Sequence, residues 1–196
     1  MMNHSLKILG SSTHTEEERE QHDYYATDPK ALISFLNAIS GDGIELNRMI
    51  WEPSCGEGNL SELLRQRGYC VLSTDLIDRG FGSQLDFLAP SSVRWDGDIL
   101  TNPPYKHALE FIETSLSRIR TGKHVVMLLR LQFLEGIKRH SFYSQHPPKY
   151  VYVHSKRIKI WKNNEQGGAN AVAYAWYIWE KGFEGDTVLR WIGGEQ

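Results

Sequence analysis

The sequence predicts an α/β fold in which helices cover both faces of a mostly parallel sheet. From residue 30 onward, stretches with helical periodicity alternate with short strand-like stretches, which is typical of strand–helix–strand units. A glycine-rich loop at 53–58 separates one strand-like stretch from the helix that follows. The run Val125-Val126-Met127-Leu128-Leu129 is continuously apolar, as in a central strand that is buried on both sides. These three observations favour one α/β domain.

The elements of the first half are predicted from a helix start, a glycine turn and two prolines. Residues 1–22 form a polar, Glu-rich extension to which we assign no chemistry. Asp28 and Pro29 suit the N-cap and the first position of a helix. From there we expect, in order, a helix at 30–39, a strand at 49–52, a helix at 59–67, a strand at 71–75, a strand at 98–101 and a helix at 106–120.

The second half begins with the apolar strand at 125–129 and continues with strand-like segments. Tyr150-Val151-Tyr152-Val153 is rich in aromatic and β-branched residues, which indicates another strand. The stretches 171–179 and 187–192 have the same character, and a glycine turn at 182–186 joins them. The chain therefore ends in two strands separated by a turn.

The glycine loop Pro53-Ser54-Cys55-Gly56-Glu57-Gly58 lies where a ligand can approach the backbone and the N–H groups of a helix start. Asp75 ends the next strand about 20 residues later, where a carboxylate can hold ribose hydroxyls. The loop also resembles a dinucleotide fingerprint, so a nicotinamide cofactor is an alternative. Glu52 and Glu57 place negative charge where a pyrophosphate would lie. This charge disfavours a dinucleotide and favours the cationic sulfonium of S-adenosylmethionine.

The tetrapeptide Asn102-Pro103-Pro104-Tyr105 follows the strand at 98–101. Two prolines end the strand, and Asn102 is kept extended at its carboxyl edge, where open α/β sheets bind ligands. Asn102 Oδ1 and the Pro103 carbonyl can together accept both hydrogens of one planar amine, and Tyr105 offers a flat face to the ring bearing it. The pattern predicts methylation of such an amine, although a simple turn closing a buried strand has the same signature.

Several motifs in register resemble those of S-adenosylmethionine-dependent amino-methyltransferases, most closely small phage- or prophage-type adenine-N6 DNA methyltransferases. The resemblance spans residues 23–192, and the order of a cofactor motif at 23–29, the glycine loop and the tetrapeptide is that of the gamma class. It implies a Rossmann-like class I methyltransferase fold, with a seven-stranded, mostly parallel sheet that ends in a C-terminal antiparallel hairpin. We expect a single methyltransferase domain at 23–196. The sequence departs here from the sequence-specific members of the family, because it leaves no room after the hairpin for the separate target-recognition domain that they carry, which argues against strict sequence specificity.

The resemblance assigns roles to individual residues. Tyr25 and Thr27 would lie over the methionine end of S-adenosylmethionine, and Asp75 would bind its ribose. Asp86 would accept from the cofactor adenine N6 with Phe87 against that ring, although Asp86 would equally suit the cap of a turn. The cofactor-binding set is Tyr25, Thr27, Glu52, Pro53, Cys55, Gly56, Gly58, Asn59, Asp75, Leu76, Asp86, Phe87 and Asn102. The catalytic set is Asn102, Pro103, Pro104 and Tyr105.

The segment 155–170 combines basic residues with an aromatic one. Lys156, Arg157 and Lys159 precede Trp161, and such a mixture suits a nucleic-acid backbone and an extruded base. In the resembled family, an aromatic residue here helps to sandwich the target base, and Trp161 is our candidate. The substrate-binding set is Tyr105, Lys156, Arg157, Lys159 and Trp161. The alternative is a solvated loop whose lysine stems lie along the surface.

The composition of the chain limits its fold class and its possible partners. With 196 residues, 40% hydrophobic and 23% charged, the chain suits one globular α/β domain. A net charge of −2 gives no global attraction to nucleic acid, so DNA contact requires a local basic patch. Cys55 and Cys70 are too few for a disulfide scaffold or zinc site, and Cys55 suits a buried thiol better than a nucleophile. We therefore expect no metal, no membrane segment and a reducing cytoplasmic setting.

The predicted function is transfer of a methyl group from S-adenosylmethionine to adenine N6 in DNA. The same amine-holding geometry serves RNA adenine and the glutamine amide of release factors. The enzymes acting on release factors usually have a helical substrate domain ahead of the glycine loop, for which about 50 residues leave little room. A catalytically silent scaffold is disfavoured by the intact tetrapeptide. A DNA-binding protein without activity is disfavoured by the acidic balance and by the lack of a recognisable reading helix.

Overall fold

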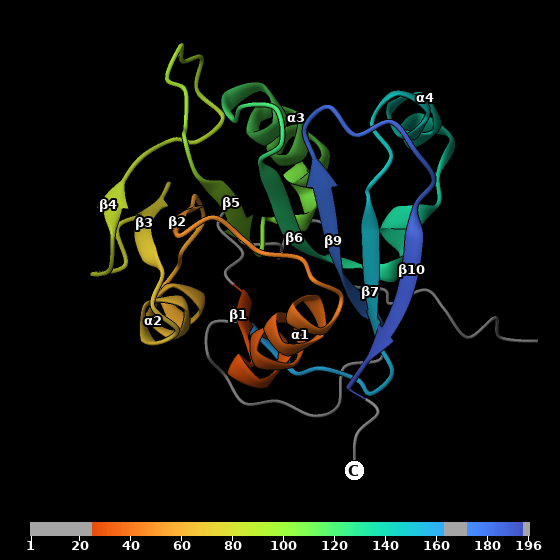
Figure 1. Cartoon of the computed structure of the whole chain (residues 1–196). Coiled ribbons are helices and arrows are strands. Elements are labelled where there is room, and N and C mark those ends of the chain that lie inside the picture. The colour runs from red at the N-terminus through yellow and green to blue at the C-terminus, as the bar shows by residue number, and fades with distance from the viewer. Residues whose placement is uncertain (1–24, 163–171, 194–196) are drawn as a thin grey trace, which may run out of the picture.

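The computed structural model describes residues 25–162 and 172–193. In these residues, eight strands form one large sheet in the order β10-β7-β9-β6-β5-β2-β3-β4 (Figure 1). Its strands in chain order are β2 (Met49–Glu52), β3 (Cys70–Asp75), β4 (Ser83–Gln84), β5 (Asp98–Thr101), β6 (His124–Arg130), β7 (Tyr150–His154), β9 (Tyr174–Glu180) and β10 (Val188–Ile192). The helices are α1 (Pro29–Gly41), α2 (Asn59–Gln66), η2 (Tyr105–His107), α3 (Ala108–Arg118), η3 (Leu131–Leu134) and α4 (Ile137–Gln145).

Helices cover both faces of this sheet, which confirms the predicted α/β architecture. On central β6, Val126 and Leu128 belong to a core cluster that includes residues of α1 and α2. The alternating residues Val125, Met127 and Leu129 belong to a second cluster with residues of α3 and α4. Each face of β6 is therefore buried by a different pair of helices, which explains its uninterrupted apolar sequence. No helix among the described residues is long and apolar enough to span a membrane.

The sheet is mostly parallel, and β9 is antiparallel to both of its neighbours, β6 and β7. The expected C-terminal hairpin is wrong in its pairing, because β10 pairs in parallel with β7, which lies between β9 and β10. The sheet consequently has eight strands and not the expected seven. The connection at 181–187 can cross two strand spacings of about 4.8 Å each, so a short turn in the sequence does not require adjacent strands.

A second, two-stranded sheet joins the beginning of the described chain to the segment after β7. In this sheet, β1 (Tyr25–Thr27) runs antiparallel to β8 (Ile160–Lys162). The Asp28 backbone N–H continues the contact by donating to the Lys159 carbonyl at 3.1 Å. The expected loop at 155–170 therefore contains a strand, which its charged composition does not reveal. Residues 163–171 and the side chains of Tyr25 and Trp161 lie outside the described part of the structure.

Several strands end at the same edge of the large sheet. Because β2, β3, β5 and β6 are parallel, their carboxyl ends lie side by side. The antiparallel β9 begins at this edge, where Tyr174 lies opposite Arg130, the last residue of β6. Ligands of open α/β sheets bind at such an edge. The tetrapeptide, the glycine loop and Asp75 all lie there, as the sequence predicts.

Candidate active site

The Asn102 side chain is held where β5 leaves the sheet. Its Nδ2 donates to Thr27 Oγ1 of β1 at 3.0 Å, and Thr27 is only 2% exposed. Ser54 of the glycine loop fixes the same turn, because its Oγ donates to the Asn102 carbonyl at 3.1 Å and lies 2.8 Å from Thr101 Oγ1. The strand β1 thus holds the carboxamide, and the glycine loop holds the backbone of the same residue. Asn102 is half-buried, and its amide nitrogen is already engaged in the hydrogen bond to Thr27.

The Tyr105 ring lies between two residues of the neighbouring strands. The Tyr174 ring centroid is 5.7 Å away at an interplanar angle of 38°, and the Arg130 guanidinium carbon lies 4.9 Å from the Tyr105 centroid. Burial, with the nearby Tyr174 hydroxyl, raises the pKa of Tyr105 well above its ordinary value, so the phenol stays protonated. The Tyr105 ring therefore contacts both a cation and a second aromatic ring. Sequence reasoning missed Arg130, although its position at the end of an apolar strand was a signal.

The glycine loop adopts a conformation that only glycine tolerates well. Gly58 has a φ of 90°, and a Cβ placed there would lie 2.4 Å from the Phe81 ring. The Gly56 backbone N–H donates to Asp75 Oδ2 at 2.8 Å, and the Ile77 N–H donates to Asp75 Oδ1 at 3.0 Å. Asp75 therefore ties the loop to the end of β3. Phe81, which covers the loop, carries no motif and could not be found from the sequence.

A buried carboxyl group, that of Glu52, lies beneath the glycine loop. The Glu52 side chain is 1% exposed and accepts a hydrogen bond from Ser61, whose Oγ lies 2.6 Å from Ser73 Oγ. Burial raises the pKa of Glu52 to about 8, against the lowering effect of the Ser61 bonds. Burial, followed by Glu52 and Asp75, raises the pKa of the Cys55 thiol to about 12. The thiol is therefore not a nucleophile at neutral pH, and the loop interior disfavours an added anion.

The other predicted cofactor residues around the loop differ in exposure. Pro53 is buried, Asn59 begins α2 and is partly buried, and Leu76 is 51% exposed just after β3. Glu57 is exposed on the loop itself. At the glycine loop, exposed residues, Glu57 and Leu76, thus lie around buried ones, Glu52 and Pro53. Within the described residues, no group of three or more His, Cys, Asp or Glu side chains is arranged to hold a metal ion.

Phe87 and Asp86 have different environments. The Phe87 ring is 2% exposed and packs edge-on against Trp51 at 5.1 Å, while the Arg118 guanidinium carbon lies 4.5 Å from its centroid. Asp86 is exposed, and its Oδ1 accepts from the Leu88 N–H at 2.9 Å. Phe87 is therefore a core residue in this structure, and Asp86 caps a turn, as the simpler interpretation of Asp86 expected. Their contacts with a cofactor adenine remain predictions.

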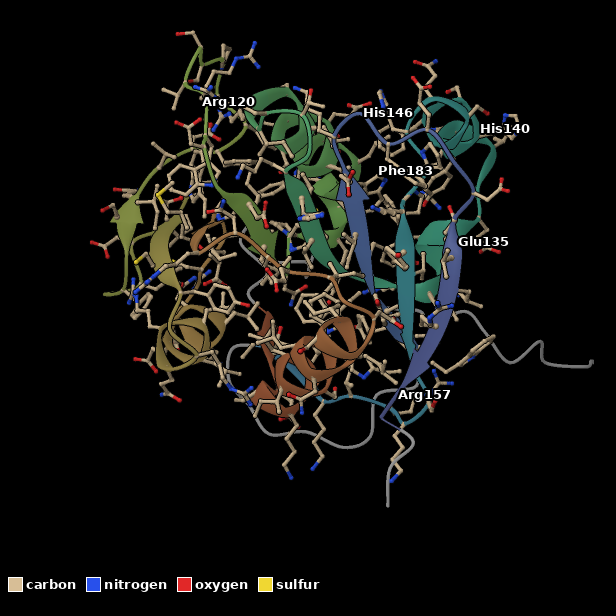
Figure 2. The ribbon with its side chains drawn as sticks, viewed as in Figure 1. Arg120, Glu135, His140, His146, Arg157 and Phe183 are labelled. Carbon is tan, nitrogen blue, oxygen red and sulfur yellow. The ribbon has the colours of Figure 1, made fainter. Side chains whose placement is uncertain are left out.

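The basic residues predicted to contact substrate lie on the surface beyond β7. Lys156, Arg157 and Lys159 are exposed, and Figure 2 shows Arg157 pointing outward from the molecule. The Lys159 backbone meets Asp28, so this segment runs beside the N-terminal strand that carries Thr27. The structure therefore brings the basic segment to the same side of the sheet as the tetrapeptide.

Solved structures share this fold at low sequence identity. A candidate RNA methyltransferase from Pyrococcus horikoshii aligns with a TM-score of 0.56 at 15% identity, over 78% of this chain and 83% of its own. A candidate class I S-adenosylmethionine-dependent methyltransferase from Listeria monocytogenes also gives 0.56 at 15% identity, over 84% and 64%. The methyltransferase subunit of a type I restriction-modification system from Streptococcus thermophilus gives 0.59 at 14% identity, over 84% and 46%.

The chain spans less than two thirds of the length of the last two proteins. No protein-family model matches the sequence, and no curated protein matches it. The similarity therefore concerns the fold, which is the Rossmann-like α/β fold of these methyltransferases. Because one fold hosts many functions, the activity has to be argued from the site.

Proposed function

We propose that this protein transfers a methyl group from S-adenosylmethionine to the N6 amine of adenine in DNA. The observation that carries the proposal is the position of Asn102 at the carboxyl end of β5 beside the glycine loop, where its carboxamide donates to Thr27 and its backbone carbonyl accepts from Ser54. A fixed amide next to a cofactor-type loop is what transfer to a planar amine requires.

The glycine loop and its surroundings fit the proposed cofactor. S-adenosylmethionine, when bound, supplies a methyl group on a positively charged sulfur. The Asp75 carboxylate lies close enough to Cys55 to raise the pKa of the thiol, so it gives the loop a negative local potential that suits a cation and opposes a pyrophosphate. Glu52 keeps its proton at neutral pH and adds no charge there, contrary to what its position in the sequence suggested. Gly56, Gly58 and Asp75 would hold the nucleoside part, and Thr27 with Asn102 would border the methionine part.

The tetrapeptide residues would prepare the substrate amine. The N6 lone pair of adenine is delocalised into the ring, so the amine is a weak nucleophile. Asn102 Oδ1 and the Pro103 carbonyl would accept its two hydrogens and stabilise the positive charge that develops on nitrogen. No general base has to act before transfer. Tyr105, a neutral phenol at physiological pH, would offer its ring to the base and would not accept a proton.

DNA is preferred as the substrate because the resembled motifs are most similar to those of DNA adenine methyltransferases. The restriction-modification subunit from Streptococcus thermophilus, which shares the fold, supports this preference. The candidate RNA methyltransferase from Pyrococcus horikoshii keeps RNA as the alternative to test. In duplex DNA, the adenine would first have to leave the stack at a cost of a few kcal/mol, part of which stacking on Tyr105 would offset.

Labelled cofactor tests the proposal directly. Purified protein is incubated with methyl-labelled S-adenosylmethionine and equal amounts of unmodified DNA, ribosomal RNA and release factor, and the labelled atom is identified by mass spectrometry. We expect N6-methyladenine in DNA. Label on RNA or on a glutamine amide would reassign the substrate, and tight cofactor binding without any transfer would indicate a silent scaffold.

The Asn102→Ala variant separates transfer from binding. We expect it to abolish methyl transfer while calorimetry still detects cofactor binding, because the glycine loop and Asp75 remain. Asn37→Ala, which removes an exposed amide from α1, is the matched control and should leave both properties unchanged. Loss of cofactor binding together with transfer in Asn102→Ala would contradict the division of roles.

A further inference from the structure

A groove lies next to the residues that contact Tyr105, and Arg157 is the one lining residue to which a substrate role has already been assigned. It has a volume of about 430 Å³ and lies between η3, the segment after β7 and the residues that precede β9. Its lining residues are Leu131, Gln132, Glu135, Arg157, Val172 and Ala173. The volume is within the roughly 300–1,000 Å³ of sites that bind small organic groups.

The floor of this groove is continuous with the residues that contact Tyr105. The Leu131 N–H donates to the Ala173 carbonyl at 2.8 Å, which joins two walls of the groove. The residue before Leu131 is Arg130, and the residue after Ala173 is Tyr174. Both of them contact the Tyr105 ring, at 4.9 Å and 5.7 Å respectively. The groove therefore begins one residue away from each of the two side chains that contact the proposed base-stacking ring.

The residues that line the groove could contact both the phosphate and the base of a nucleotide. Arg157 is exposed at one side, and a guanidinium matches the geometry of a phosphate. Gln132 and Glu135 are exposed at the other side, and Figure 2 shows Glu135, the residue that directly follows η3, above Arg157. A carboxamide and a carboxylate can both accept from the exocyclic amine of adenine or cytosine. Leu131 and Val172 supply apolar surface between the polar ends.

We propose that this groove binds the nucleotide next to the target adenine, with Arg157 on its phosphate and Gln132 and Glu135 on the edge of its base. The proposal rests on the proposed function and adds a specificity determinant to it. A base that presents an exocyclic amine on its major-groove edge, adenine or cytosine, can donate to both acceptors, whereas thymine and guanine present no amine on that edge. The enzyme should therefore prefer adenines that have such a neighbour on one side.

The base contact is tested with duplex oligonucleotides that carry one adenine between randomised neighbours. After partial methylation, sequencing that detects N6-methyladenine gives the relative rate for every neighbour. We expect a preference of about fivefold or more for adenine or cytosine at one adjacent position, as one base contact of about 1 kcal/mol or more would give. The double variant Gln132→Ala/Glu135→Ala should reduce this ratio to about one. Equal rates in the wild type, or an unchanged ratio in the variant, would overturn the proposal.

The phosphate contact is tested by binding, which needs no turnover. The affinity for a fluorescein-labelled oligonucleotide is measured at several salt concentrations. Arg157→Ala should weaken binding and reduce the slope of log affinity against log salt by about one. Arg120→Ala is the control, because Arg120 is also exposed but pairs with Asp96 and precedes β6 at the opposite edge of the sheet, a position that Figure 2 shows.

The two tests separate failure of the groove from failure of the proposed function. Equal effects of Arg157→Ala and Arg120→Ala would mean diffuse attraction and would overturn the groove assignment. If the wild type methylates no DNA, the proposed function fails. Loss of affinity in Arg157→Ala but not in Arg120→Ala would still support a nucleotide site in the groove.

Discussion

Replacing Glu52 with glutamine tests the buried acidity beneath the glycine loop. The Glu52 side chain is 1% exposed, and burial raises its pKa from 4.5 to about 8. Glutamine has nearly the same shape, and its carbonyl can accept the hydrogen bond that Ser61 now donates. The substitution therefore removes the ionisation while it preserves the packing.

The size of the effect follows from the pKa difference. In the unfolded chain, Glu52 loses its proton near pH 4.5, whereas in the folded protein it keeps the proton up to about pH 8. Between these values, each pH unit lowers the free energy of unfolding by about 1.4 kcal/mol. From pH 5 to pH 7 the loss is roughly 3 kcal/mol, which is a large fraction of the 5–15 kcal/mol typical of a domain.

Urea denaturation at pH 5, 6, 7 and 8 measures the effect. The stability of Glu52→Gln relative to the wild type should rise with pH and approach a plateau above pH 8. Glu57→Gln makes the same exchange at an exposed position of the glycine loop and is the control, because its effect on stability should not change in this way with pH. If the stability difference between Glu52→Gln and the wild type stays constant across this range, the pKa of Glu52 is not raised. The carboxyl group beneath the glycine loop would then not be buried as described.

Three further substitutions test the contacts around the loop and the turn. Thr27→Val removes the hydroxyl that accepts from Asn102, so methyl transfer should slow about 5- to 10-fold in single-turnover assays, as expected for a bond of about 1 kcal/mol; an unchanged rate would argue against positioning by β1. Gly58→Ala places a Cβ 2.4 Å from the Phe81 ring, at a φ of 90° that alanine tolerates poorly. Urea denaturation should therefore show that the free energy of unfolding falls by about 1–3 kcal/mol. A variant as stable as the wild type would mean that Phe81 does not cover the loop tightly. Arg118→Met removes the guanidinium whose carbon lies 4.5 Å from the centroid of the buried Phe87 ring, and it removes the hydrogen bond to the Ala89 carbonyl at 3.1 Å. The free energy of unfolding should therefore fall by about 1–3 kcal/mol. An unchanged denaturation midpoint would contradict this expectation.

The fold was largely predictable because, in most elements, the local sequence preference matches the structure that the element adopts. Asp28 accepts from the Lys30 N–H at 2.9 Å and Pro29 opens α1, as the sequence predicts. The apolar run of β6 is buried on both faces, and the tetrapeptide ends β5 at the ligand-binding edge. These predictions depend on short-range rules that the surrounding structure does not change.

Strand partners were less predictable, because they depend on contacts between distant segments. Nothing in the turn at 182–186 indicates that β7 lies between the two strands it joins. The three-residue strand β8 is too short and too charged to show an alternating pattern, and it exists because β1 supplies its hydrogen bonds. For the same reason, the contact of Arg130 with Tyr105 could not be found from either residue alone.

The small β1–β8 sheet connects the two halves of the proposed site. Thr27, which holds the Asn102 carboxamide, is paired in register with Ile160, and the basic segment immediately precedes that residue. Backbone pairing is stiffer than a free loop, so a displacement of the basic segment has to be accommodated by β1 and hence by the contact with Asn102. A nucleic-acid strand bound at Arg157 would therefore favour the same pairing that orients the carboxamide. Substrate binding and alignment of Asn102 should accordingly be coupled, because both require the β1–β8 sheet to be formed.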